Sequence, residues 1–314
     1  MNQQKRSKSV MRIHIHGGDD APDSFVPYGT VSGAEGGPRV AIVAGVHGTE
    51  LVTQDAVQML WQQLDPQSLR GSLTVVFVAD VLAAQAGLPG VNPVDGRNLN
   101  RVWPGSDRGS YSERLAFRLW SELLSQPEFV IDVHGGEWTE EVIPFALVHA
   151  TGDSGRDQRA RELASQMRLP YLQTTAGEGT LSGAVARSGR VGLALEVGGG
   201  GRRSQADIDQ VLLALRGVLE AVGSIEVALA PAAGETRILS GGEQLRTSVA
   251  GVAVPQVRLG DAVAGGQKLF VITDFDGEPL EEIKATRAGT VLLRSLGRVV
   301  AAGSLVATVG WSGD

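Results

Sequence analysis

Three polar side chains lie at the ends of apolar runs and are of the types that hold a catalytic metal ion. His47 and Glu50 form a His-x-x-Glu pair after the run 40–45, and His134 ends the run 129–134. Such a short pair is common by chance, and a histidine at a strand end is often only a satisfied polar residue. A catalytic zinc site, however, needs three nitrogen or oxygen ligands and an open position for water. A close pair plus one distant ligand meets that need, so we predict one Zn²⁺ held by His47, Glu50 and His134.

A fourth polar residue, Glu196, lies within the apolar run 191–197, directly before a run of glycines. Burying a carboxylate between Leu195 and Val197 is costly unless it has a partner. Desolvation would raise its pKa toward neutrality, which suits a general base. An ion-paired structural carboxylate, or a strand residue that faces outward, would give the same pattern. From the residues alone, Glu196 is therefore a candidate base with these alternatives open.

The composition restricts the ligands and the partners. There is no cysteine, so a metal site must use histidines and carboxylates. The net charge of −7 argues against nucleic acid as a partner, since phosphate binding needs a concentrated basic surface. No apolar run approaches the roughly 18 residues of a membrane span. The first twelve residues hold four basic side chains and are followed by no apolar run, so we expect a frayed tail rather than a secretory signal. We expect a cytoplasmic protein with no membrane partner, and we leave a homo-oligomer open.

The candidate residues follow short apolar runs that alternate with longer amphipathic stretches. The β-branched runs predict buried strands over 40–45, 73–80, 129–134, 144–149 and 191–197. The amphipathic stretches predict helices over 51–64, 112–124, 156–167 and 205–222. This alternation predicts a three-layer α/β fold with a mixed, mostly parallel sheet. In such sheets, sites form beyond the carboxyl ends of the strands, where the candidate residues lie.

The last part of the chain has a different pattern. After Pro231 the helical period disappears, and the segment 250–272 resembles the segment 288–309. Each half is too small to bury its own face, so we expect the two to close into a small β-barrel or sandwich. We therefore predict a catalytic domain over 1–225 and a β-rich domain over 226–314. We expect the second domain to be structural, shaping the mouth of the site or an oligomer contact.

Four segments together resemble a known family. GVHGTE, NLNRVWPG, DVHGG and LEVGGGG occur in this order and at fitting intervals. They are similar to segments of the succinylglutamate desuccinylase/aspartoacylase family, in the zinc carboxypeptidase-like superfamily, and the similarity extends over nearly the whole chain. It implies that His47, Glu50 and His134 are zinc ligands and that Glu196 is the catalytic carboxylate.

The resemblance also implies roles for Asn100 and Arg101, which match the pair that holds the substrate's carboxylate or polarises its carbonyl. The chain departs from the family pattern at Asn98, where an aspartate is common. It also lacks the further arginine expected upstream of that segment for a substrate carboxylate. Arg187 or Arg190, shortly before Glu196 in the sequence, could serve instead, and we choose Arg187 as the candidate.

These residues predict a zinc-dependent deacylase that cleaves the amide of a small N-acylated amino acid or a related N-acyl compound. Glu196 would take a proton from the attacking water and pass it to the leaving amine. Arg101 would stabilise the oxyanion or hold a carboxylate. A metallocarboxypeptidase or peptide amidase is the alternative enzyme. A non-catalytic carboxylate-binding protein on the same fold is the alternative from another class.

Overall fold

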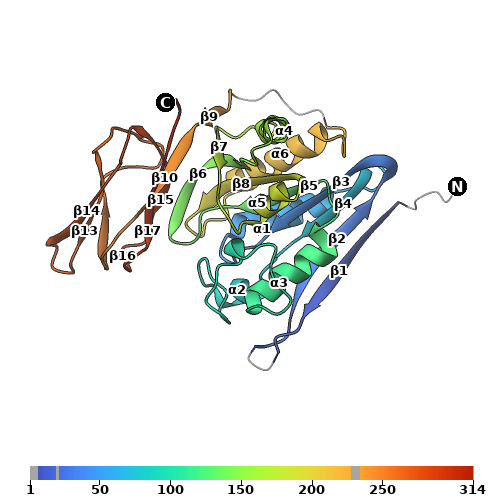
Figure 1. Ribbon diagram of the computed structural model, residues 1–314, viewed down its shortest axis with the longest axis horizontal. Coiled ribbons are helices and arrows are strands. Elements are labelled where there is room, and N and C mark those ends of the chain that lie inside the picture. The colour runs from blue at the N-terminus through green and yellow to red at the C-terminus, as the bar shows by residue number, and fades with distance from the viewer. Residues whose placement is uncertain (1–5, 19–20, 228–233, 314) are drawn as a thin grey trace.

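The computed structural model describes residues 6–18, 21–227 and 234–313, and its main feature is a 13-stranded mixed sheet (Figure 1). Four neighbouring strands at its centre run parallel, in the order β4 (Arg70–Val76), β3 (Ala34–Ala44), β5 (Phe129–His134) and β8 (Val191–Gly199). The mixed sheet confirms the predicted fold class. The parallel pairing predicted for most of the sheet is concentrated in this centre.

Antiparallel strands extend the sheet on both sides of its centre. On one side lie β2 (Ser24–Ser32) and β1 (Ser7–Ile15); on the other lie β6 (Glu140–His149), β15 (Gly289–Ser295), β17 (Leu305–Trp311) and β10 (Gly241–Arg246). Three shorter strands pair beside this path: β7 (Tyr171–Thr175) with β6, β9 (Arg237–Leu239) with β7, and β12 (Ala262–Val263) with β15. The C-terminal part of the chain therefore continues the main sheet through the β6–β15 pair.

The N-terminal strand corrects one expectation. The frayed tail expected over the first twelve residues is wrong for residues 7–12, which belong to β1 and pair with β2. Residues 1–5 lie outside the described part. In β1, Ile13 and Ile15 are buried while His14 is exposed, because alternate side chains of a strand point to opposite faces.

Helices cover both faces of the sheet and complete the three layers. One apolar core packs α1 (Leu51–Gln63), α4 (Ser154–Ser165) and α6 (Gln205–Ala221) on one face. A second core on the other face packs α3 (Tyr111–Leu119), its π-helical continuation η2 (Trp120–Leu124) and α5 (Leu181–Arg187). Two short elements follow nearby loops, α2 (Val81–Ala86) and the 3₁₀ turn η1 (Leu99–Arg101). Strand β3 serves both cores, because Ile42 faces the first and Val43 the second. None of the helices in the described residues is long and apolar enough to cross a membrane.

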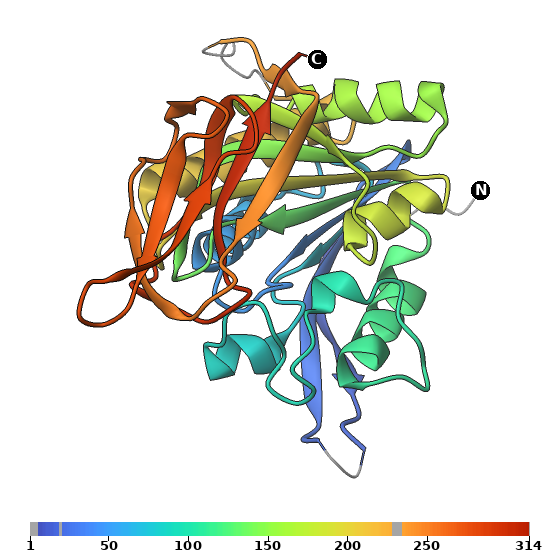
Figure 2. The same cartoon turned by 60° about the vertical axis from the view of Figure 1, so that its left-hand side comes forward.

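The C-terminal repeat forms two sheets that face each other. A separate antiparallel sheet contains β14 (Pro279–Lys284), β13 (Lys268–Thr273), β11 (Gly251–Pro255) and β16 (Val299–Val300). Strands of the two halves pair with each other: β11 of the first half pairs with β16 of the second, and β12 of the first pairs with β15 of the second. Side chains of both halves, such as Ile272 and Val309, share one core. Within residues 234–313 the strands form this interlocked sandwich and no closed barrel, and they lie against the β6 side of the main sheet (Figures 1 and 2).

Candidate active site

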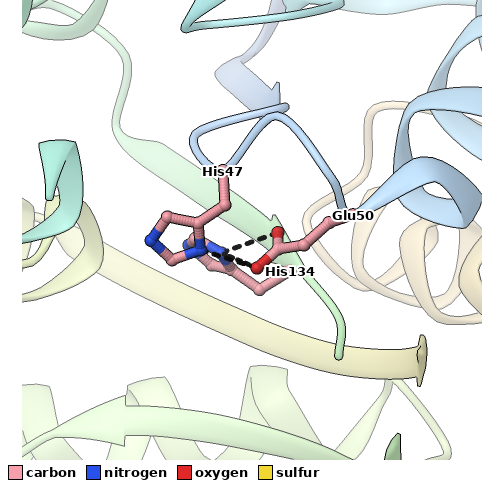
Figure 3. A group of neighbouring side chains, drawn as sticks. All are labelled: His47, Glu50 and His134. Carbon is pink, nitrogen blue, oxygen red and sulfur yellow. Dashed lines mark hydrogen bonds and ion pairs between the residues drawn. The ribbon is translucent and has the colours of Figure 1, made fainter. Parts of the chain in front are cut away.

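The three predicted metal ligands meet at the carboxyl ends of β3 and β5. The chain leaves β3 through Gly45, whose φ of +66° suits glycine and whose Cβ, if present, would lie 2.8 Å from the Cα of Val78. This turn carries His47, and Glu50 occupies the N-cap position of α1 with a buried side chain that makes no capping hydrogen bond. His134 ends β5, and Figure 3 shows its ring and that of His47 directed at the Glu50 carboxylate.

The possible ligand atoms of the three side chains converge closely enough to hold one metal ion. His47 Nδ1 lies 2.6 Å from Glu50 Oε1, and His134 Nδ1 lies 3.1 Å from Glu50 Oε2. One ligand atom from each residue falls in a group whose members are within 4.8 Å of one another. Two ligand atoms at the usual zinc distances are about 3.3 Å apart when the ion is tetrahedral. The three side chains therefore have the chemistry and the convergence that a zinc ion requires.

The outward-facing nitrogen of each histidine has a partner of its own. His47 Nε2 lies 3.1 Å from Asn98 Oδ1, and His134 Nε2 lies 2.9 Å from Asp132 Oδ1. Metal-binding histidines commonly donate their second ring N–H to an oxygen, and Asn98 is placed to accept such a bond from His47. Asn98, where the family commonly has an aspartate, can serve the same purpose, because its amide oxygen can accept the hydrogen bond from His47 as a carboxylate would.

Asp132 is a further sign that the site holds positive charge. Its side chain is completely buried, and neither oxygen has a partner with hydrogen-bond geometry, despite the short distance to the His134 ring. A buried carboxylate is unfavourable unless a cation lies nearby. A divalent ion beside His134 would offset the charges of Asp132 and Glu50 together.

The pKa values of the three side chains show the same preference for positive charge. Burial opposes the charged form of His47, but the Glu50 carboxylate outweighs it and raises the pKa to about 9. Burial likewise opposes charging His134, yet Asp132 and Glu50 raise its pKa well above the usual value. For Glu50, burial favours the neutral acid, but the two histidines lower the pKa to about 2. The pocket thus stabilises cations, which are protons when no metal is bound.

Glu196 lies beside the predicted metal ligands on the neighbouring strand. In the parallel pairing of β5 with β8 it is opposite His134, and its half-buried side chain lines the space next to the ligands. Burial raises its pKa to about 8, against the lowering effect of His134. The structure shows no ion pair for Glu196 within the described residues, so the ion-paired alternative has no support. A carboxylate with this position and pKa can accept and return a proton near neutral pH.

Asn100 and Arg101 reach the site from η1. Asn100 Nδ2 lies 3.0 Å from His134 Nε2, while its Oδ1 accepts a hydrogen bond of 2.8 Å from the backbone N–H of Leu181. Arg101 donates to the carbonyl of Asn100 over 2.7 Å, and no carboxylate pairs with it in the described ranges. The Cβ that Gly179 lacks would lie 2.2 Å from the carbonyl oxygen of Arg101, so this glycine allows the close approach that positions η1.

Two cavities open from the metal ligands and share His47, Arg101 and Glu196 in their walls. The first, here called the Arg246 cavity, has a volume of about 370 Å³ and is also lined by Glu50, Glu137, Glu140, Gln244, Arg246, Leu293 and Ser295. The second, the His149 cavity, has a volume of about 450 Å³ and is also lined by Asn100, Asp132, His149, Gln173, Thr180 and Ser182. Spaces of this size accept small molecules.

The arginines predicted from the sequence have different positions. Arg101 lines both cavities, whereas Arg187 is exposed at the end of α5 and lines neither. Its charge does act on His149, whose pKa is lowered to about 4, mainly by burial and then by Arg187. Arg190 donates to backbone carbonyls that include Pro127 O at 2.9 Å and therefore has a structural role. The substrate-binding role predicted for Arg187 is not supported by its position.

Several residues of the site were missed by sequence reasoning. Asp132 is a charged residue in the middle of an apolar run, and that signal could have identified it in the same way as Glu196. Glu137 and Glu140 follow His134 closely, but their sequence has no distinguishing pattern. Gln244 and Arg246 come from β10, more than a hundred residues after His134, and the pairing of the C-terminal strands with β6 brings them to the same cavity as His47 and Glu50.

Comparison with known proteins agrees with this geometry. The model of the succinylglutamate desuccinylase/aspartoacylase catalytic domain matches residues 36–222. The N-alpha-acetyl-L-2,4-diaminobutyric acid deacetylase of Halomonas elongata is 29% identical over 294 residues, which cover 91% of this chain and 85% of that protein.

Solved structures resemble the whole chain. The product-bound ectoine utilization protein EutE (DoeB) from Ruegeria pomeroyi has a TM-score of 0.87 at 26% identity, with 98% of this chain and 99% of that chain covered. A succinylglutamate desuccinylase/aspartoacylase from Rhodobacter sphaeroides has a TM-score of 0.85 at 26% identity, with 98% and 96% covered. The relatives whose names state a reaction are deacylases, which supports an amide-hydrolysing activity. The match of the catalytic-domain model over more than half of the sequence confirms the predicted resemblance: the chain belongs to the succinylglutamate desuccinylase/aspartoacylase family.

Proposed function

We propose that the protein is a zinc-dependent deacylase that hydrolyses the amide bond of a small N-acyl amino acid. The observation that carries this proposal is the placement of Glu196 next to His47, Glu50 and His134, with Arg101 in the same two cavities. Zinc, when bound, supplies a Lewis acid and lowers the pKa of a water molecule toward about 7. The remaining steps depend on side chains of this chain.

Glu196 acts as the proton carrier in this mechanism. As water attacks the amide carbonyl, the carboxylate takes one proton from the water. When the C–N bond breaks, the same carboxyl group gives that proton to the amine, which leaves as a neutral group, and Glu196 returns to its ionised form. The pKa of about 8 set by burial makes both transfers feasible near neutral pH.

Arg101 and Asn100 position the substrate. Arg101 has N–H groups that are not used by its bond to the Asn100 carbonyl, and these can stabilise the developing oxyanion or hold a carboxylate. Asn100 is fixed by Leu181 N–H and lies against His134, so it holds Arg101 in register with the metal ligands. Positioning of this kind lowers the entropic part of the barrier.

Nα-acetyl-2,4-diaminobutyrate is our first choice of substrate, because the Halomonas elongata relative named for its deacetylation aligns over most of both chains. The test is a panel of zinc-loaded reactions in which release of free amine is measured. We expect kcat/KM for N-acetyl and N-succinyl amino acids to exceed that for dipeptides of similar size by at least about tenfold.

Each other outcome selects a different function. A preference for dipeptides would identify a carboxypeptidase or peptide amidase. Tight binding of N-acyl amino acids, with no amine released from any compound, would identify a non-catalytic carboxylate-binding protein. Either result would refute the deacylase proposal.

A further inference from the structure

The C-terminal part forms one wall of the active-site cavity. Strand β10 contributes Gln244 and Arg246 to the Arg246 cavity, and β15 contributes Leu293 and Ser295. Two of the proposed metal ligands, His47 and Glu50, line the same cavity together with Glu196 and Arg101. A molecule bound for hydrolysis therefore contacts both parts of the chain, and the C-terminal part can select it.

Two hydrogen bonds hold the Arg246 side chain, and its other N–H groups remain available as donors. Its Nη1 donates to the carbonyl of Gly303 over 3.0 Å, and its Nη2 donates to Gln244 Oε1 over 3.1 Å. A guanidinium has five N–H donors, so donors remain available after these two bonds. No carboxylate pairs with Arg246 in the part of the chain that the structure describes, although Glu137 and Glu140 line the same cavity.

Other arginines near this junction are already paired. Arg294 donates to Glu141 Oε1 over 2.9 Å, and Arg202 lies 3.6 Å from Glu141 Oε2. In the Arg246 cavity, the guanidinium groups are those of Arg101 and Arg246, and neither has a carboxylate partner among the described residues. Both side chains are exposed, and a guanidinium fork that lines a cavity next to a hydrolytic centre is suited to bidentate binding of a carboxylate.

The positions of the two arginines suggest different tasks. Arg101 lines both cavities and is bonded to Asn100, which contacts the metal ligand His134, so it belongs with the reacting carbonyl. Arg246 lines the Arg246 cavity alone. We propose that Arg246 is a specificity-determining residue that binds the substrate's carboxylate, and that the substrates are N-acyl compounds whose carboxylate extends toward the C-terminal part. This proposal rests on the proposed deacylase function.

The assignment also accounts for the arginine that the sequence pattern lacks upstream of Asn100. The family resemblance predicts a second cation for a substrate carboxylate, and Arg187 does not reach either cavity. Arg246 supplies a cation from the opposite side, through a strand of the C-terminal part. A ligand that carries both a carboxylate and an ammonium group would also find Glu140 in the same cavity.

The test compares the binding of an acid with that of its neutral amide. Zinc-loaded protein with the background substitution Glu196→Gln, which prevents turnover, is titrated calorimetrically with Nα-acetyl-2,4-diaminobutyrate and with its carboxamide. We expect the acid to bind at least about tenfold more tightly than the amide, the value of one charge-assisted contact. Adding Arg246→Gln should reduce this ratio to about twofold or less.

Arg258→Gln in the same background is the matched control, because Arg258 is exposed in the C-terminal part and lines neither cavity. It should leave the acid-to-amide ratio unchanged, and all variants should bind zinc as their parent does. A merely structural role of Arg246 would weaken both ligands equally and leave their ratio intact.

The outcomes separate this proposal from the deacylase function. Any of three results overturns the role of Arg246. The acid-to-amide ratio could stay unchanged in the Arg246→Gln variant, or it could fall equally in the Arg258→Gln variant. The parent could also show no preference for the acid. Hydrolysis by the wild-type chain tests the deacylase function independently. If the wild type hydrolyses nothing but Arg246→Gln still removes the preference, the carboxylate site stands and the deacylase proposal fails.

Discussion

Replacement of Glu196 with glutamine is expected to lower kcat by about 10²–10⁴-fold while the protein keeps its zinc ion. Glutamine has nearly the same shape but cannot take a proton from water or return it to the amine. Glu196 lies opposite His134 in the β5–β8 pairing but is not one of the converging ligand group, so the metal should stay bound. The measurements are steady-state kinetics on N-acetyl amino acids and zinc content by mass spectrometry.

The pH profile of the wild type should agree with this role. The base works only when ionised, so kcat/KM should rise with pH through the pKa of Glu196. That pKa is about 8 in the metal-free site because of burial, and a nearby divalent cation lowers it. The acid limb should therefore have its midpoint below about pH 8.

Glu162→Gln is the control for this substitution, since Glu162 lies on the exposed side of α4, outside both cavities. It should leave kcat unchanged. Loss of zinc from the Glu196→Gln variant would mean that Glu196 is a ligand rather than a base, and unchanged turnover would remove it from the mechanism.

His134→Ala should have the second large effect, a loss of zinc affinity greater than that caused by Asp132→Asn. The first substitution removes a ligand atom, whereas the second removes the negative charge 2.9 Å from His134 Nε2 and one of the two carboxylate oxygens. Loss of such an outer partner typically costs about 10–100-fold in affinity. The order of the two effects, measured by competition with a chelator, tests whether Nδ1 of His134 faces the metal and Nε2 faces Asp132.

His14→Ala is the matched control, because His14 is exposed on β1 and distant in the fold from the ligands. Its zinc affinity should equal that of the wild type. Equal affinities for the His134→Ala variant and the wild type would exclude His134 from the ligand set, whatever the geometry of the side chains.

Much of the catalytic part could be predicted from the sequence because its signals are local. The apolar runs that became β3, β5 and β8 are buried on both faces, and such strands have nearly continuous hydrophobic sequences. His47, Glu50, His134 and Glu196 lie at or near the ends of these strands, so the parallel order of the sheet was enough to bring them together.

The rest of the site depends on contacts between distant segments. The repeat predicted that two halves would interlock, but nothing in it indicated that β15 pairs with β6. That pairing places Arg246 in the cavity, while Arg187, which is closer to Glu196 in sequence, is exposed at the end of a helix. Nearness in sequence was a poor guide here, because Arg187 is at the exposed end of α5 and lines neither cavity.

The zinc content of the purified protein tests the central claim most directly. The protein is stripped with a chelator, reloaded with Zn²⁺, and assayed for both bound metal and hydrolysis of N-acetyl amino acids. Three converging ligands, His47, Glu50 and His134, predict one zinc ion per chain and the return of activity in proportion to bound zinc. A chain that binds no zinc and hydrolyses no amide after zinc is added would contradict the account.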